Sequence, residues 1–223
     1  MTELVFTDLV ALDDAQRERV RVIYEEAFPE WERGPFDQLV AAARRGERHD
    51  LVALDAGLPV AFAALARLQE VDCMYLEYLA VADDRRGQSL GTTMWGQLLA
   101  VLADRDEPLR LVFEVEHPEA DGIAPTEAEL RRRRIHFYER LGAAPLPYPG
   151  YLVPNLVDGG TEPMQLMYAD CSTAPQPQPR GEAVRHLVLA LYAAGYDLAE
   201  DHPLLARARE ASTEGVEVGH GSL

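Results

Sequence analysis

The feature that most constrains this chain is a strand that runs into a glycine-containing turn and then directly into a helix. The apolar strand covers Tyr75–Val81, the turn covers Asp83–Gly91, and the helix covers Thr92–Ala103. In such an arrangement several backbone N–H groups point at one spot, and the helix N-terminus adds partial positive charge there. The pattern predicts a turn that binds a pyrophosphate.

The remaining periodicities predict an α/β chain in the order β α α β β β α β α β β. The expected strands are 3–8, 51–55, 59–68, 74–81, 109–116, 148–153 and 163–168, and the expected helices are 16–28, 36–45, 92–103 and 126–141. Asp13 or Asp14 can cap the first of these helices. Thr126 and Glu129 have the spacing of a capping box for the last one.

The turn resembles the acyl-CoA loop of the GNAT superfamily (Gcn5-related N-acetyltransferases), whose pattern is Arg/Gln-x-x-Gly-x-Gly/Ala. Arg86, Ser89 and Gly91 fill the three defined positions, so serine replaces the first glycine. The element order over residues 1–170 is also the GNAT order. The resemblance implies a GNAT acyltransferase domain at 1–170, with a mixed, mostly antiparallel, splayed sheet flanked by helices.

The resemblance implies acetyl-CoA as the cosubstrate. In the family the pantetheine arm pairs with the splayed strand, which places the Leu79 N–H at the acyl carbonyl and Ala80 and Val81 at the pantetheine amides. The pyrophosphate would be held by Arg86, Gly87, Gln88, Ser89, Leu90, Gly91 and Thr92. We expect an ordinary φ at Ser89. The alternative is a plain glycine turn that ends a strand.

A candidate acid lies in the segment Arg134-Ile-His-Phe-Tyr-Glu-Arg-Leu-Gly142, which resembles the family's Phe-Tyr-Glu-x-x-Gly-Phe helix. Tyr138 falls on the position whose hydroxyl lies near the CoA sulfur. A tyrosine is protonated at neutral pH and can donate to a leaving thiolate. The alternative is a core aromatic, because Ile135, Tyr138 and Leu141 share a helix face.

A general base is needed because a protonated amine cannot attack a thioester. One candidate is Glu77, on the strand that would bind the pantetheine arm. Strict alternation places Glu77 on the same face as Tyr75, Leu79 and Val81. From there Glu77 could order a bridging water.

Two further carboxylates, Glu114 and Glu116, lie on the strand Leu-Val-Phe-Glu-Val-Glu, on the face opposite Phe113. This strand resembles the Leu-x-Leu-Glu-Val-Arg strand of bacterial ribosomal-protein acetyltransferases, and Glu114 matches the glutamate proposed as base there. We expect Glu114 to be the main base, with a pKa raised by repulsion from Glu116. Glu116 would hold the cationic acceptor. His117 is a weaker candidate.

The run Arg131–Arg134 has two interpretations. It is either a solvated helix face or a positive patch that attracts the phosphates of the cofactor. The acceptor side is expected to be walled by segments 29–48 and 146–155, which carry the aromatic residues Trp31, Phe36, Tyr148 and Tyr151.

Composition limits the partners. The net charge is −17, which argues against nucleic acid and an anionic membrane surface as partners. The two cysteines, Cys73 and Cys171, have no metal-ligand spacing, so no metal is expected and a reducing cytoplasm fits. No apolar run is long enough to span a bilayer, and we expect no export signal.

Beyond the GNAT-like part, residues 171–181 are predicted to be a Pro-rich linker and 182–223 a helical extension with a disordered tail. Val184, Leu187 and Leu191 form an apolar stripe on the expected helix. The stripe must pack either on the domain or on a second subunit of a homodimer.

These features predict an N-acetyltransferase that transfers an acetyl group from acetyl-CoA to a primary amine of a small molecule or peptide. The amine would attack directly in a ternary complex, because neither Cys73 nor a serine lies in a nucleophile–base setting. One alternative is a non-catalytic acyl-CoA-binding sensor or structural module. Another is an acyltransferase that uses a longer acyl-CoA.

Overall fold

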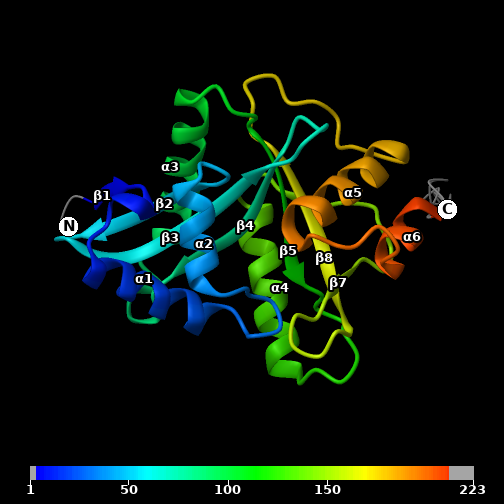
Figure 1. Ribbon diagram of the computed structural model, residues 1–223, viewed down its shortest axis with the longest axis horizontal. Coiled ribbons are helices and arrows are strands. Elements are labelled where there is room, and N and C mark those ends of the chain that lie inside the picture. Colours follow the sequence, from blue (N-terminus) through cyan, green and yellow to red (C-terminus); the bar gives the residue numbers. More distant parts are fainter. Residues whose placement is uncertain (1–3, 211–223) are drawn as a thin grey trace, which may run out of the picture.

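The computed structural model describes residues 4–210, which form one mixed sheet with helices on both faces (Figure 1). The strands are β1 (Leu4–Thr7), β2 (His49–Asp55), β3 (Leu58–Arg67), β4 (Met74–Val81), β5 (Arg110–Glu116), β6 (Ala144–Pro145), β7 (Leu152–Pro154) and β8 (Thr161–Asp170). The helices are α1 (Asp14–Ala27), α2 (Phe36–Arg44), α3 (Leu90–Asp104), α4 (Pro125–Glu139), α5 (Glu182–Tyr196) and α6 (Pro203–Glu210), with short 3-10 turns η1 (Leu9–Ala11) and η2 (Asp83–Arg85).

The sheet has the order β1-β2-β3-β4-β5-β8-β6, and β7 pairs with β8. Every pairing is antiparallel except β4 with β5, which is parallel. These two strands pair only through Met74 with Leu111 and Tyr75 with Val112. Past that point they diverge, as Figure 1 shows. The predicted splayed, mostly antiparallel sheet is therefore confirmed.

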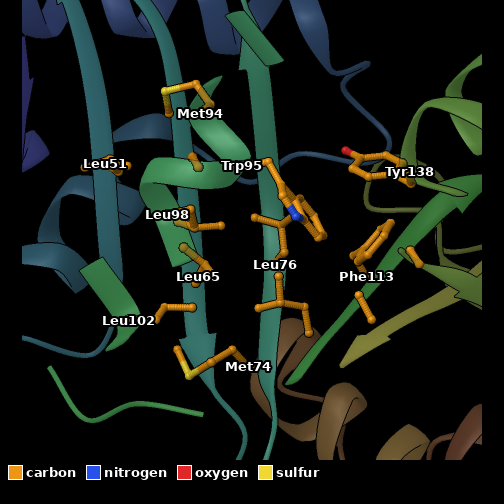
Figure 2. Close-up of a cluster of buried hydrophobic side chains, with 14 of the residues drawn as sticks. Leu51, Leu65, Met74, Leu76, Met94, Trp95, Leu98, Leu102, Phe113 and Tyr138 are labelled. Carbon is orange, nitrogen blue, oxygen red and sulfur yellow. The ribbon is translucent and has the colours of Figure 1, made fainter. Parts of the chain in front are cut away.

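One face of the sheet packs on α3 and α4. Its buried cluster joins Met94, Trp95 and Leu98 of α3 to Leu65, Leu76 and Phe113 of the strands and to Tyr138 of α4 (Figure 2). The opposite face carries α1 and α2 over β2–β4, and α5 and α6 over β5, β7 and β8. Helices from two distant parts of the chain thus cover the face on which the sheet opens.

A β-bulge interrupts β4 at Glu77. In the β3–β4 ladder Ala64 pairs with Tyr78 and Leu65 pairs with Leu76, so Glu77 is the extra residue. A bulge reverses the side-chain alternation beyond it. Leu79 therefore packs toward α3 and α4, whereas Tyr75 packs toward α5. The expectation that these two residues share a face was wrong, because it assumed unbroken alternation.

The starts of α1 and α4 are determined in different ways. Asp13 caps α1, and its carboxylate accepts from the Gln16 N–H at 2.8 Å while Gln16 Oε1 accepts from the Asp13 N–H. The capping box expected at Thr126 and Glu129 is absent from α4. That helix begins one residue earlier, at Pro125, because proline suits the first helical position.

The C-terminal helices dock on the sheet of their own chain. Val184, Leu187 and Leu191 of α5 are buried in a cluster that includes Tyr75 and Val112. The apolar stripe predicted for this helix is confirmed, and its partner is the GNAT-like part itself. The tail expected to be disordered lies at 211–223, outside the described residues. Within 4–210 no helix is long and apolar enough to cross a membrane.

Candidate active site

The turn between β4 and α3 presents unused backbone donors. Gly87 has a positive φ of 78°, and Ser89 precedes the first residue of α3. Among residues 4–210, no backbone hydrogen bond uses the N–H groups of Gly87, Gln88 or Ser89. The first N–H groups of α3 also have no partner inside the helix. This cluster of donors at a helix N-terminus fits a pyrophosphate.

Ser89 adopts a left-handed conformation, with φ 61° and ψ 13°. The expectation of an ordinary φ at this residue was therefore wrong. The turn must reverse direction within a few residues of the η2 turn, and this geometry favours glycine, which is the residue usual at this position of the motif. A serine in this left-handed conformation raises the free energy of the folded chain by about 1–2 kcal/mol relative to a glycine. Its side chain does not cap α3.

The edge of β4 that faces β5 is open beyond Tyr75. Leu79, Ala80 and Val81 pair with β3 on one side only, because the β4–β5 ladder has already ended. Backbone groups that point away from β3 are therefore available to an extended ligand, as in strand addition. This open edge leads directly to the turn at 86–92.

Tyr138 lies between the sheet and α3. Its ring packs 4.4 Å from the ring of Phe113 and 5.9 Å from that of Trp95, measured between centroids. Figure 2 shows its hydroxyl at the end of the ring that points toward β4. Burial raises the pKa of Tyr138 to about 12, so the hydroxyl holds its proton at neutral pH. The packing and donor interpretations are compatible at this residue.

A cleft of about 880 Å³ opens beside the splay. It lies between α2 and the loop before it, the β4 bulge, Glu114 of β5 and the C-terminal end of α5. Six carboxylates and three arginines line it: Glu30, Glu32, Glu47, Glu77, Glu114, Asp197, Arg33, Arg45 and Arg48. The excess of carboxylates favours a cationic ligand.

Of the two segments expected to wall the acceptor side, 29–48 supplies much of the cleft lining. The aromatic residues of the cleft differ from those expected, and they are Tyr24, Tyr75, Tyr78 and Tyr196. No residue of the second segment, 146–155, lines the cleft, and Tyr151 is connected to it only because its hydroxyl donates to Glu114.

Glu114 is held by three tyrosine hydroxyls. Oε2 accepts from Tyr75 at 2.7 Å and from Tyr196 at 2.9 Å, and Oε1 accepts from Tyr151. Burial raises the pKa of Glu114, and these hydrogen bonds lower it by less, so the net direction is upward. The direction agrees with our expectation. The expected cause, repulsion from Glu116, was wrong, because burial is the cause.

The other two candidate carboxylates are paired with arginine. Glu77, at the bulge, forms an ion pair with Arg48. Glu116 forms one with Arg134, and Arg131 lies 4.0 Å away. The negative charge of Glu116 is thus already compensated, which removes the role expected for it as the anchor of a cationic acceptor. Glu77 lines the cleft, whereas Glu116 does not.

Glu32 is a cleft carboxylate that sequence reasoning missed. It lies in the loop between α1 and α2, and burial raises its pKa to about 7. Glu114 adds to this increase, while Arg134 and Arg131 oppose it. No motif marks Glu32, because the loop reaches the cleft only through tertiary contacts. One of them joins the Leu156 N–H to the Trp31 carbonyl at 2.9 Å.

The run Arg131–Arg134 is engaged with carboxylates of the same chain. Arg131 pairs with Glu127 at 3.0 Å, and Arg132 and Arg133 both pair with Glu129. His117 accepts from the Glu119 N–H and is not among the residues that line the cleft. Within residues 4–210, no group of three or more His, Cys, Asp or Glu side chains could hold a metal ion.

The sequence profile of the Acetyltransferase (GNAT) family matches residues 17–143, from within α1 to just beyond the end of α4. This stretch covers more than half of the chain and includes the turn, the splayed strands and Tyr138. The chain belongs to the GNAT acetyltransferase family. A comparison with curated protein sequences gives no match.

Solved structures show the same fold at low identity. A protein described as a GNAT-family acetyltransferase from Bacteroides thetaiotaomicron is 21% identical, with a TM-score of 0.58 over 86% of this chain and 98% of that chain. An aminoglycoside 6'-N-acetyltransferase complexed with coenzyme A is 20% identical, with a TM-score of 0.59 over 77% and 99%. The ribosomal-protein-S18-alanine N-acetyltransferase from Escherichia coli is 19% identical, with a TM-score of 0.53 over 79% and 99%.

Proposed function

We propose that this GNAT acetyltransferase transfers an acetyl group from acetyl-CoA to a primary amine of a small molecule or peptide. The observation that carries the proposal is the acidic cleft beside the splay of β4 and β5, with Glu114 at the point where the strands part. A cationic amine is drawn to such a cleft. Solved structures of the same fold include acetyltransferases for an aminoglycoside and for a ribosomal protein.

Acetyl-CoA supplies the acetyl thioester when it is bound. The open edge of Leu79–Val81 fits the pantetheine arm, and the free N–H groups of 87–92 fit the pyrophosphate. We propose that the Leu79 N–H donates to the acyl oxygen. The chain's main contribution is then to hold the thioester and the amine in one geometry.

Glu114 is the proposed general base. It is held by neutral hydroxyls, whereas Glu77 and Glu116 are neutralised by arginine. A carboxylate has about four acceptor positions, so three tyrosines leave one open for the amine or for a water molecule. The raised pKa of Glu114 suits a group that takes a proton near neutral pH.

Glu32 is proposed to bind the ammonium form of the acceptor, the role that Glu116 cannot fill. Its loop lines the same cleft as Glu114. A cation that binds beside Glu32 offsets the cost of burying the carboxylate and lowers the raised pKa of that group. Tyr138 is the proposed donor to the leaving thiolate.

Direct attack on the thioester is favoured over a cysteine intermediate. Burial raises the pKa of Cys73 to about 12, and its thiol donates to the Arg110 carbonyl at 3.2 Å. A thiol with so high a pKa is a poor nucleophile. Both cysteines are free thiols, which supports the cytoplasm as the proposed compartment.

The test is a panel of primary amines, from monoamines to polyamines and peptide N-termini, incubated with acetyl-CoA while free CoA thiol is measured. We expect turnover with cationic amines and a KM for the amine that rises with salt, because salt screens the acidic cleft. Glu114→Gln should lower kcat/KM by roughly a hundredfold and remove the acidic limb of its pH profile. Glu77→Gln should retain that limb.

Each alternative has its own outcome. Loss of the acidic limb in Glu32→Gln but not in Glu114→Gln would move the base to the α1–α2 loop. Faster turnover with a longer acyl-CoA than with acetyl-CoA would change the proposed donor. Binding of acetyl-CoA without thioester cleavage by any amine of the panel would leave the chain as a non-catalytic acyl-CoA-binding module.

A further inference from the structure

The C-terminal extension reaches the acceptor cleft. The last residues of α5, Ala193–Tyr196, line the cleft together with Asp197, which has a left-handed φ of 46° and follows the helix end. The earlier part of the helix packs on the sheet, where Val184, Val188 and Leu191 are buried among strand residues. Its cleft end is therefore held in place by apolar packing.

The close approach of α5 to Tyr75 of β4 depends on the absence of a side chain at Gly195. A side-chain carbon at Gly195 would lie 2.9 Å from Cε1 of Tyr75, closer than real contacts allow. Tyr75 is buried and donates to Glu114, so its ring has little freedom to move away. Glycine at 195 brings the following residue, Tyr196, within reach of the same carboxylate.

The Tyr196 hydroxyl donates to Glu114 Oε2 at 2.9 Å. The three donors on Glu114 come from separate parts of the chain: Tyr75 from β4, Tyr151 from the segment before β7, and Tyr196 from α5. Residues 4–181 without the extension would leave Glu114 with two donors and the cleft without one wall.

We infer that the C-terminal extension is part of the active site: the end of α5 forms a wall of the acceptor cleft, and Tyr196 positions Glu114 for its reaction. The inference rests on the proposed function, since it assigns Tyr196 to the base of that reaction. Tyr196 acts through Glu114 and is a positioning residue.

The predicted effect of Tyr196 on Glu114 has a definite sign. A hydroxyl that donates to a carboxylate stabilises its charged form, so removal of the hydroxyl raises the pKa of Glu114. The titratable groups that contact Glu114 or interact with its charge are Glu32, Tyr75, Tyr151, Tyr192 and Tyr196. The cleft adds the other carboxylates and the arginines named above, with Tyr24 and Tyr78. All except Tyr196 are unchanged in a Tyr196→Phe variant.

The experiment compares Tyr196→Phe with Tyr192→Phe. Tyr192 lies one turn earlier on α5, and its hydroxyl donates to the Leu152 carbonyl at 2.6 Å rather than to Glu114. For both variants and the wild type, the pH profile of kcat/KM is measured with the best amine of the panel. The carboxyl carbon of Glu114 is titrated in parallel by NMR on protein labelled at glutamate with ¹³C, with Glu114→Gln used for assignment.

We expect Tyr196→Phe to move the acidic limb and the NMR titration of Glu114 upward by about one pH unit. Tyr192→Phe should leave both in place. An NMR titration that is identical in Tyr196→Phe and the wild type would overturn the inference. If the wild type acetylates no amine, the proposed function fails, and the NMR titration still decides whether Tyr196 acts on Glu114.

Discussion

At the scale of single residues, the three carboxylates expected in the site differ in what surrounds them. Glu77 and Glu116 each contact an arginine, which stabilises their charged forms. Glu114 contacts hydroxyls, which can keep donating while its own charge changes. A group whose partners are neutral can gain a proton without leaving a buried cation unpaired. This difference supports Glu114 as the proposed general base.

The role of Tyr138 is tested by Tyr138→Phe. We expect kcat to fall by roughly a hundredfold, because the change removes the proposed donor to the leaving thiolate in the transition state. The KM for acetyl-CoA should stay within about twofold. Steady-state kinetics at saturating amine measure both values.

The melting temperature of Tyr138→Phe is the structural control for this test. Phenylalanine keeps the ring that packs 4.4 Å from Phe113, so the melting temperature should not change. A kcat equal to that of the wild type would reduce Tyr138 to a core aromatic, the alternative interpretation of its helix position.

At the scale of elements, the start of α3 is both a helix N-terminus and the proposed binding site for the pyrophosphate. Thr92 is exposed at the third position of the helix, where a negative side chain interacts favourably with the helix dipole. The same negative charge would repel a pyrophosphate. Thr92→Glu should therefore preserve or raise the melting temperature and weaken acetyl-CoA binding by about tenfold or more. Calorimetric titration measures the affinity.

Thr92→Gln is the matched control, because it has the same shape without the charge. Its affinity for acetyl-CoA should stay close to that of the wild type. Gly91 is a poorer site for this test, since any side chain there would meet the Phe137 ring at 3.1 Å. Equal affinities of Thr92→Glu and Thr92→Gln would place the cofactor away from the turn.

The C-terminal helices also stabilise the domain. A chain that ends before Ser172 loses α5 and α6 and exposes Tyr75, Val112 and Tyr168. Each large apolar side chain that loses its burial costs about 1.5–3 kcal/mol, so we expect the melting temperature to fall by on the order of 10 °C or more. Differential scanning calorimetry measures this change.

A chain that ends after Glu210 is the control for the truncation, because it retains α5 and α6. It should melt like the full chain. If the shorter truncation also melted unchanged, the docking of these helices would contribute nothing to stability.

At the scale of the whole molecule, two buried carboxylates make stability depend on pH. Burial raises the pKa of Asp50 and of Glu32 to about 7. Both oxygens of Asp50 are buried without a hydrogen-bond partner among the described residues. Between their unfolded-state values near 4 and their folded values, these groups bind more protons in the folded state. Their contribution to the free energy of unfolding therefore falls as pH rises through this window.

Asp50→Asn tests this linkage with a side chain of the same shape. Urea unfolding at several pH values should show a shallower fall in the variant, by up to about 1.4 kcal/mol per pH unit between pH 4 and 7. The comparison uses slopes, so the constant cost of burying an amide does not affect it. Parallel slopes for the two proteins would mean that Asp50 is ionised normally in the folded state.

The local pattern of the chain was enough to predict the turn before α3 and the apolar stripe of α5, whereas the splayed sheet was predicted from the resemblance to the GNAT family. Alternation in β5 placed Glu114 opposite Phe113, and the helical spacing placed Val184, Leu187 and Leu191 on one face. Such features depend on residues that are neighbours in the chain, so periodicity and turn chemistry determine them.

Only the tertiary structure determined which side chains contact each carboxylate of the site. The bulge at Glu77 arises from its pairing with β3, and the arginine on Glu116 comes from α4. The loop that carries Glu32 and the helix end that carries Tyr196 reach the cleft from opposite ends of the chain. Burial and contacts of this kind are set by how distant segments pack together, and they determine the pKa values and donors on which the chemistry depends.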